Sequence, residues 1–323
     1  MMIDAVWFLA GLVALIFGAE IMVRGGAEVA ARLGISPIVI GLTVVSIGTS
    51  LPELAVGVVA VQEGSGALAV GNIAGTNVVN LLLILGLSAL IVPLAMAART
   101  LSFELPVMAG AAVLMLLLSL DGVLTQLDGL VLVAGAVAYT VTLIRVTRRE
   151  TAAVVHEYDE EYPPETVAVR TRTSLHVAMM LGGIAIVVIG ADWLVDGAVG
   201  MARDFGVSDA LIGLTVVAIG TSAPELVTTV VSTIRGNRDI AIGNLLGSSI
   251  YNILLILGAT CLVASEGLVL PASLVRIDIP IMVAVALVCV PIFVSGRRVT
   301  RGEGGGMVLA YLTYLSFLLL TQS

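Results

Sequence analysis

Two stretches of this chain, 172 residues apart, carry almost the same sequence. Residues 41–53 read GLTVVSIGTSLPE and residues 213–225 read GLTVVAIGTSAPE, so eleven of the thirteen positions are identical. The same offset aligns GNIAGTNVVNLLLILG at 71–86 with GNLLGSSIYNILLILG at 243–258, without a gap. Two long matches at one offset indicate an internal duplication, so the two halves are expected to share one fold.

The composition places this duplicated fold in a membrane. Of the 323 residues 59% are hydrophobic and 12% are charged, whereas a soluble domain averages about 45–50% apolar and about 25% charged residues. Ten apolar windows are long enough to cross ~30 Å of hydrocarbon. They cover residues 3–23, 36–61, 67–92, 102–120, 126–146, 175–195, 208–234, 240–264, 273–295 and 305–321. We therefore predict an all-α membrane protein with ten transmembrane helices.

The number of windows in each half determines how the halves are related. Five spans precede the polar segment 147–174 and five follow it, and because five is odd, the second half must enter the membrane upside down. Charges at matched positions agree, since Arg24 pairs with Asp196 and Glu63 with Arg235 at the offset. Arg203, which matches Ala31, is the single exception. We predict two inverted five-helix repeats, 1–146 and 175–323, an architecture typical of secondary transporters with a site at the repeat interface.

The distribution of arginine predicts the orientation. With both termini outside, thirteen of the fifteen basic residues, all arginine, would face the cytoplasm, as the positive-inside rule requires. We expect a multi-pass cell-membrane protein with a cytoplasmic linker at 147–174. The first apolar window lacks a basic n-region and is expected to be a mature helix rather than a signal peptide. The acidic run 157–161 lacks EF-hand spacing and is expected to be solvated linker, with a regulatory Ca2+ sensor as the alternative.

Several functional classes find no support in the sequence. No H-E-x-x-H, G-x-S-x-G or P-loop pattern is present, so we expect neither an enzyme nor a bound cofactor. Cys261 and Cys289 stand far apart inside apolar windows and are expected to be packing residues. The net charge of −8 argues against a nucleic-acid partner.

The duplicated motif places Glu53 and Glu225 inside otherwise apolar spans. A carboxylate in hydrocarbon costs roughly 2.5–3.5 kcal/mol on insertion scales, so it requires a partner. One interpretation is a structural glutamate bonded to a neighbouring helix. Because two glutamates recur in inverted copies and no basic residue occupies the midplane of a span, a bound cation is the simpler counter-charge.

The residues around each glutamate supply further oxygen atoms. Pro52 and Pro224 have no backbone N–H, which leaves the carbonyls of Gly48 and Gly220 free and tends to distort the preceding turn. Carbonyls or hydroxyls are then available from Ser46, Thr49, Ser50, Ala218, Thr221 and Ser222, and the third span of each half adds Thr76 with Asn80, and Ser248 with Asn252. An oxygen-only set of this kind suits Ca2+ and Na+, and disfavours zinc or copper. The G-x-x-x-G pairs at 71/75 and 243/247 are expected to allow close helix approach.

With these paired GTSxPE and GNxxG[TS]xxxN motifs, the chain resembles the cation/calcium exchanger superfamily, specifically the prokaryotic Na+/Ca2+ exchangers. The resemblance implies that Ca2+ is bound by Glu53, Glu225 and the carbonyls of Thr49 and Thr221. It implies Na+ sites at Ser46, Thr49, Ser50 and Thr76 in one half and at Ala218, Thr221, Ser222 and Ser248 in the other, with Asn80 and Asn252 between them. It also implies that the first and sixth helices are a sliding pair that switches access.

One departure and two alternatives accompany this resemblance. Family members often carry Asp where this chain has Asn252, and Asn at both matched positions argues against K+ dependence. A Ca2+/H+ exchanger on the same fold is the nearest alternative; it needs a carboxylate that takes up a proton inside the membrane, which Glu53 or Glu225 could supply. A passive cation channel is a second alternative and would need no counter-ion. The oligomeric state is left open, with a monomer among the possibilities.

Overall fold

The structure is a computed structural model that describes residues 2–161, 173–205 and 218–322. Its backbone is almost entirely helical, and several long helices contain π-helical turns, labelled η. The first half contains α1 (Met2–Leu33), α2 (Pro37–Ile40), η1 (Gly41–Val45), α3 (Ser46–Thr49), α4 (Leu51–Gln62), α5 (Gly66–Val78), η2 (Val79–Ile84), α6 (Leu85–Ile91), η3 (Thr100–Glu104), α7 (Leu105–Leu118) and α8 (Gln126–Glu161). The second half contains α9 (Thr173–Asp204), α11 (Ala218–Thr221), α12 (Ala223–Ile234), α13 (Arg238–Tyr251), η5 (Asn252–Leu257), α14 (Gly258–Val263), η6 (Leu274–Asp278), α15 (Ile279–Val294), the 3-10 turn η7 (Ser295–Arg297) and α16 (Arg301–Gln322).

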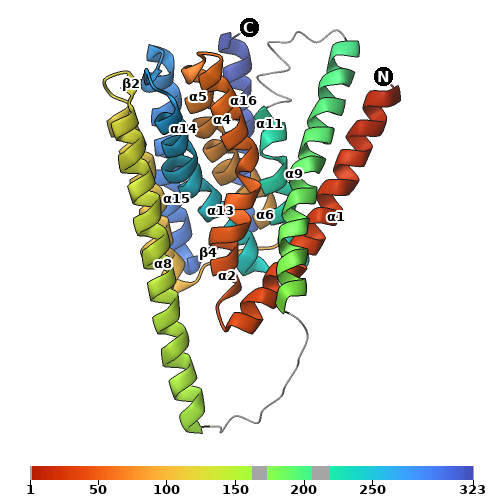
Figure 1. The fold of residues 1–323 in the computed structure, drawn as a ribbon, viewed down its shortest axis with the longest axis vertical. Helices are drawn as coiled ribbons and strands as arrows, with labels where there is room; N and C mark the ends of the chain where they lie inside the picture. Colours follow the sequence, from red (N-terminus) through yellow and green to blue (C-terminus); the bar gives the residue numbers. More distant parts are fainter. Residues whose placement is uncertain (1, 162–172, 206–217, 323) are drawn as a thin grey trace.

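The helices stand roughly side by side, with both chain termini at the same end of the molecule (Figure 1). Within the described ranges, eight helical segments are long and apolar enough to cross a membrane. The seventh predicted span, 208–234, is represented by α11 and the short apolar helix α12, because residues 206–217 lie outside the described part of the chain. The tenth corresponds to α16, whose first residues, RGEGGG, are polar or small. The prediction of an all-α membrane fold is confirmed.

Three helices continue well beyond the apolar windows that predicted them. The windows 3–23 and 175–195 lie inside α1 and α9, each of 32 residues. The polar end of α1 is held in helical form by ion pairs four residues apart, Arg24 with Glu20 and Arg32 with Glu28. Helix α8 continues through the predicted start of the linker to Glu161. The linker 147–174 is therefore helical at both ends, and its centre, 162–172, lies outside the described residues.

Helices α1 and α9 pack against each other in antiparallel directions along a seam of glycines (Figure 1). The seam residues recur every seven positions: Gly11, Gly18 and Gly25 on α1, and Gly183, Gly190 and Gly197 on α9. A Cβ atom on Gly183 would lie 2.7 Å from the Gly18 carbonyl oxygen, and one on Gly11 would lie 2.6 Å from that of Gly190. Only glycine permits backbones to approach this closely.

Two short antiparallel strand pairs connect loops from different halves. Strand β1 (Leu94–Ala95) pairs with β4 (Arg298–Val299), and β2 (Val123–Leu124) pairs with β3 (Leu268–Val269). The two pairs lie toward opposite ends of the molecule (Figure 1). In each pair, one strand lies in the loop after the third span of one half and the other lies in the loop after the fourth span of the other half. The two strand pairs are therefore equivalent under the duplication.

Candidate cation site

The helix that carries each motif glutamate is interrupted three residues before it. Ser50 separates α3 from α4 with φ/ψ of −86°/7°, and Ser222 separates α11 from α12 with φ/ψ of −85°/3°. In both cases the break lies two residues before the motif proline, as the missing N–H and the ring of proline predict. Glu53 and Glu225 thus stand in the first turn of a new helix, at matched positions and in matched backbone conformations.

Both glutamates are buried, with 0% of Glu53 and 1% of Glu225 exposed. They lie close enough to interact electrostatically. Neither oxygen of Glu53 and only one oxygen of Glu225 has a hydrogen-bond partner within the described part of the chain. An unpaired buried carboxylate is costly, and two of them together are costlier still. Such a pair of carboxylates requires either a bound cation or a proton on at least one of them.

The two asparagines expected at the site occupy π-helical turns. Asn80 lies in η2 and Asn252 begins η5, and both side chains are completely buried. Their amide nitrogen and oxygen atoms have no hydrogen-bond partner among the described residues. Helix α12, with Glu225, packs against η2, and α4, with Glu53, packs against η5. Each glutamate helix therefore faces the asparagine turn of the opposite half, and π-helical turns are frequent at functional sites.

Hydroxyl groups from both halves surround the Glu225 carboxylate. Ser50 Oγ donates to Glu225 Oε1 at 3.2 Å. The Thr49 and Ser248 hydroxyls lie 3.4 Å apart, and both face the same carboxylate. Ser248 Oγ also donates to the Ser46 carbonyl at 3.5 Å. The structure thus brings Ser46, Thr49, Ser50 and Ser248 together beside Glu225.

For the other predicted oxygen donors to a cation, the structure shows burial or position in the fold. Thr76 and Ser222 are buried, and their hydroxyls lack a hydrogen-bond partner in the described ranges. Thr221 ends α11 and is mostly buried, and Ala218 begins the same short helix. Residues 213–217 of the second motif copy lie outside the described residues.

Asn244 also belongs to this network, although it was not predicted. Its Oδ1 accepts a hydrogen bond from Thr49 Oγ1 at 3.1 Å, and its Nδ2 donates to Thr229 Oγ1 at 3.1 Å. Asn244 is the second residue of the repeated GNxxG motif and matches Asn72 at the offset. The repeat therefore contained the signal for Asn244, whereas nothing in the motif indicated Thr229.

The glycines of the second GxxxG pair permit close helix approach, as predicted. A Cβ atom on Gly243 would lie 2.5 Å from the Ile38 carbonyl oxygen, and one on Gly247 would lie 2.6 Å from Ser46 Oγ. These contacts press α13 against the segment 38–46 and so bring Ser248 to Ser46. For Gly71 and Gly75 the matching segment is 210–218, of which 210–217 lie outside the described residues.

Two other buried or partly buried glutamates are paired with arginine. Glu104 is buried and forms an ion pair with Arg99 at 3.1 Å. Glu20 Oε2 accepts from Arg235 Nε at 2.7 Å, which ties α1 to the end of α12. Cys261 and Cys289 are buried free thiols, as expected. In the described ranges no three His, Cys, Asp or Glu residues gather as a metal site, so a cation at the motif glutamates would depend on neutral oxygens as well.

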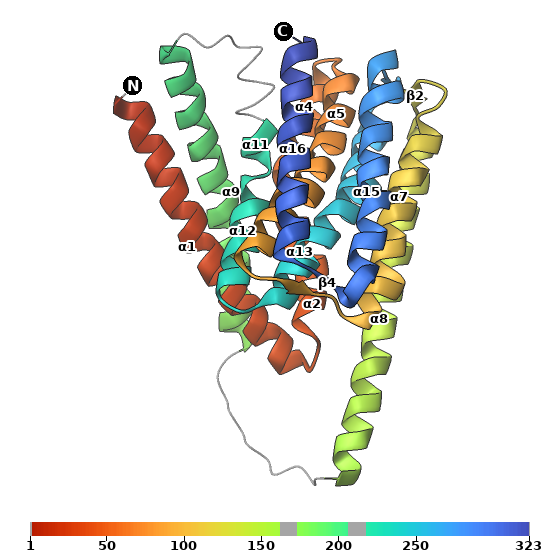
Figure 2. The same cartoon turned by 180° about the vertical axis from the view of Figure 1, so that it is seen from behind.

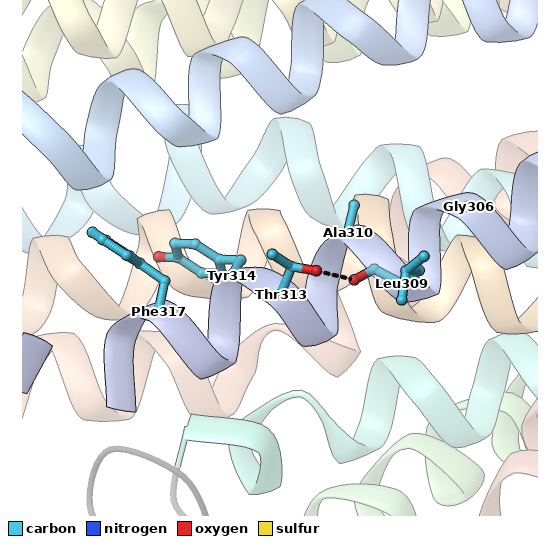
Figure 3. Close-up of a pocket in the computed structure, with 6 residues that line it drawn as sticks. All are labelled: Gly306, Leu309, Ala310, Thr313, Tyr314 and Phe317. Atoms are coloured by element: carbon cyan, nitrogen blue, oxygen red, sulfur yellow. Dashed lines mark hydrogen bonds between the residues drawn. The ribbon is translucent and has the colours of Figure 1, made fainter. Parts of the chain in front are cut away.

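A groove on the surface of α16 does not belong to this site. Figure 3 shows it lined by Gly306, Leu309, Ala310, Thr313, Tyr314 and Phe317. Its lining is largely apolar and without charge, and the Thr313 hydroxyl is used by a 2.9 Å hydrogen bond to the Leu309 carbonyl. Leu309, Thr313 and Phe317 are exposed on the molecular surface. The groove suits acyl chains and offers little to an ion.

Comparison with known proteins gives matches over almost the whole chain. The sequence model of the family described as "Sodium/calcium exchanger protein" matches residues 3–145 and 175–320. The putative antiporter CaxA of Alkalimonas amylolytica is 36% identical over 319 residues, which cover 97% of this chain and 98% of that protein. The sodium/calcium exchanger MaX1 of Methanosarcina acetivorans is 31% identical over 342 residues, covering 95% and 96% of the two chains.

The fold matches solved structures as well. A structure of the sodium-calcium exchanger NCX_Mj, soaked with Na+ and Ca2+, superimposes with a TM-score of 0.84 at 26% sequence identity. The match covers 98% of each chain. The two ranges matched by the family model leave out the whole polar segment 147–174 between the halves of this chain.

Proposed function

The chain belongs to the sodium/calcium exchanger family, and we propose that it is a secondary antiporter that exchanges Na+ for Ca2+ across a membrane. Its relatives are exchangers and antiporters rather than enzymes. Its apolar helices make it a multi-pass membrane protein. The observation that carries the proposal is the pair of buried glutamates, Glu53 and Glu225, whose remaining oxygens have no partner among the described residues.

In the proposed site Ca2+ lies between the two glutamates. Their charges balance one divalent ion, and the carbonyls of Thr49 and Thr221 complete an oxygen shell of the kind that Ca2+ prefers. Na+ would bind in competition at Ser46, Thr49, Ser50 and Thr76 on one side and at Ala218, Thr221, Ser222 and Ser248 on the other. Asn80 and Asn252 would supply neutral oxygens between them. The matched helix breaks and the buried, unpartnered hydroxyls and amides support this assignment.

We further propose ten spans in two inverted repeats, 1–146 and 175–323, with both termini outside and the linker 147–174 cytoplasmic. The matched breaks at Ser50 and Ser222 and the seam between α1 and α9 support this arrangement. The two seam helices would move together against the remaining helices and open the site alternately to each side.

The coupling ion is tested by Ca2+ uptake into proteoliposomes. An outward Na+ gradient is expected to drive 45Ca2+ accumulation, because Na+ and Ca2+ compete for the same carboxylates. A pH gradient of equal size, imposed without Na+, is expected to drive none. Uptake that follows the proton gradient and ignores Na+ would replace this proposal with Ca2+/H+ exchange, and uptake without any counter-ion would indicate a channel.

The orientation is tested by single cysteines at two exposed positions, each just after the second span of one half. Glu63→Cys is expected to react in intact cells with a membrane-impermeant maleimide, whereas Asp239→Cys is expected to react only in inverted vesicles. Both native cysteines are buried, so background labelling is low. The reverse labelling pattern would turn the proposed topology over.

A further inference from the structure

A stripe of hydroxyl groups runs along α12 from the site toward one end of the molecule. Thr228 and Ser232 stand three and seven residues after Glu225, so all three side chains lie on one face of the helix. Both hydroxyl-bearing residues are completely buried. The helix runs from the middle of the molecule toward the end opposite to the two termini (Figure 2).

The hydroxyls of Thr228 and Ser232 are not used in the way that buried helix hydroxyls usually are. In this chain such groups commonly donate to the carbonyl four residues earlier, as Thr233, Ser249 and Thr260 do at 2.7 to 3.0 Å. Thr228 and Ser232 make no such bond and have no other partner in the described part of the chain. Because an unsatisfied polar group inside a membrane protein is costly, these hydroxyls are expected to serve a ligand or water.

The stripe is present in only one half of the duplication. The positions of α4 that match Thr228 and Ser232 are Val56 and Ala60. The hydroxyls are therefore not part of the symmetric ion site, which repeats in both halves. The path from Glu225 to the membrane face at Arg235 therefore carries hydroxyls that the matching path along α4, to the opposite face, lacks.

The helix that carries the stripe is hydrogen-bonded to the site through Thr229, and it ends beside an ion pair. Next to Thr228, the Thr229 hydroxyl accepts from Asn244, which in turn accepts from Thr49 of the site. At its far end, α12 finishes beside Arg235, which is bonded to Glu20 of α1. A cation that leaves Glu225 along this face of α12 would meet the hydroxyls of Thr228 and Ser232, which have no partner among the described residues, before it reaches the charged end of the helix.

We propose that Thr228 and Ser232 form a transit site for partly dehydrated Na+ between Glu225 and the membrane face at Arg235. Their neutral oxygens replace part of the hydration shell of a monovalent ion. A resting Ca2+ would require carboxylates, which the stripe lacks beyond Glu225. This inference rests on the proposed Na+/Ca2+ exchange. It adds a difference in Na+ access between the two membrane faces, which a symmetric inverted repeat would not produce.

The test removes the oxygens with little change in shape, in the double variant Thr228→Val with Ser232→Ala. Na+-driven 45Ca2+ flux is measured in right-side-out and in inverted membrane vesicles, with Na+ titrated on the face at Arg235 and on the opposite face. The half-saturating Na+ concentration at the Arg235 face is expected to rise about tenfold or more. A change of this size corresponds to the loss of two contacts that are each as strong as a hydrogen bond. At the opposite face the shift should stay below about twofold.

A matched control and a reverse variant keep this test decisive. Thr142→Val removes an exposed hydroxyl that is bonded to the Ala138 carbonyl and should leave both titrations unchanged. Val56→Thr with Ala60→Ser adds the missing hydroxyls to α4 and should lower the Na+ requirement at the opposite face. This second variant decides the matter if the first does not fold.

The outcomes separate the transit site from the exchange itself. Equal shifts at both faces, or no shift in folded variants, would rule out the transit site while wild-type exchange stands. Absence of Na+-driven flux in the wild-type protein would instead refute the proposed function.

Discussion

Replacing Glu53 by Gln is expected to abolish Na+-driven Ca2+ uptake, and replacing Glu225 by Gln is expected to do the same. Each change keeps the shape of the side chain but removes one of the two buried carboxylate charges to which the proposed cation would bind. Breaking a buried charge pair from one side costs about 3–5 kcal/mol. That loss corresponds to a fall of more than about a hundredfold in affinity, measured as 45Ca2+ binding to the purified protein and as uptake into proteoliposomes.

Glu63→Gln is the matched control for these variants. Glu63 is exposed and follows the end of α4, the same helix that carries Glu53, so its neutralisation should leave uptake within about twofold of wild type. Size-exclusion profiles distinguish a lost site from a lost fold. Wild-type binding and flux in a well-folded Glu53→Gln or Glu225→Gln protein would show that the two carboxylates do not bind the transported ion.

A leucine at Gly183 is expected to separate α1 from α9. The new Cβ would lie 2.5 Å from the backbone nitrogen of Met22 and 2.7 Å from the Gly18 carbonyl oxygen. Backbone atoms cannot move aside as a flexible side chain can, so the cost should reach or exceed the ~1–3 kcal/mol that is typical of overpacking. We expect lower thermal stability in detergent, measured by fluorescence-detected size exclusion, and loss of exchange.

Gly182→Leu provides the comparison on the neighbouring residue of the same helix. Gly182 is exposed, and a Cβ there meets no atom within 4 Å among the described residues. Both substitutions replace glycine by leucine in a helix and differ only in the face that they alter. If the two variants had equal stability and equal flux, the close packing of the seam would be irrelevant to the exchanger.

Much of the fold could be predicted because hydropathy and duplication report on different properties. Apolar windows locate segments that lipid can accept. The ends of the windows 67–92 and 240–264 agree within two residues with the ends of α5 to α6 and of α13 to α14. The windows failed where charges continue a helix. The ion pair of Arg24 with Glu20 stabilises the polar end of α1, and the hydropathy window ends before Arg24 because hydropathy does not register the pairing of charges.

The site was predictable to the extent that it is symmetric. Glu53 with Glu225 and Asn80 with Asn252 recur at one offset, and all four are buried. Thr228 and Ser232 could not be found in this way, because Val56 and Ala60 occupy the matched positions. Nor could the sequence indicate that their hydroxyls leave the local backbone carbonyl unbonded, since that depends on a rotamer set by the neighbouring helices.

The glycine seam has a consequence for the history of the chain. The seam contacts are symmetric between the two halves. When each residue is replaced by the one at the matching position 172 residues away, the contact of Gly11 with Gly190 becomes the contact of Gly183 with Gly18. Two separate copies of a half-length ancestor, inserted in opposite directions, would meet along this same interface without any fusion to join them. The pairing of α1 with α9 would then be a homodimer contact older than the single polypeptide, and gene fusion would only have fixed which copy faces which way.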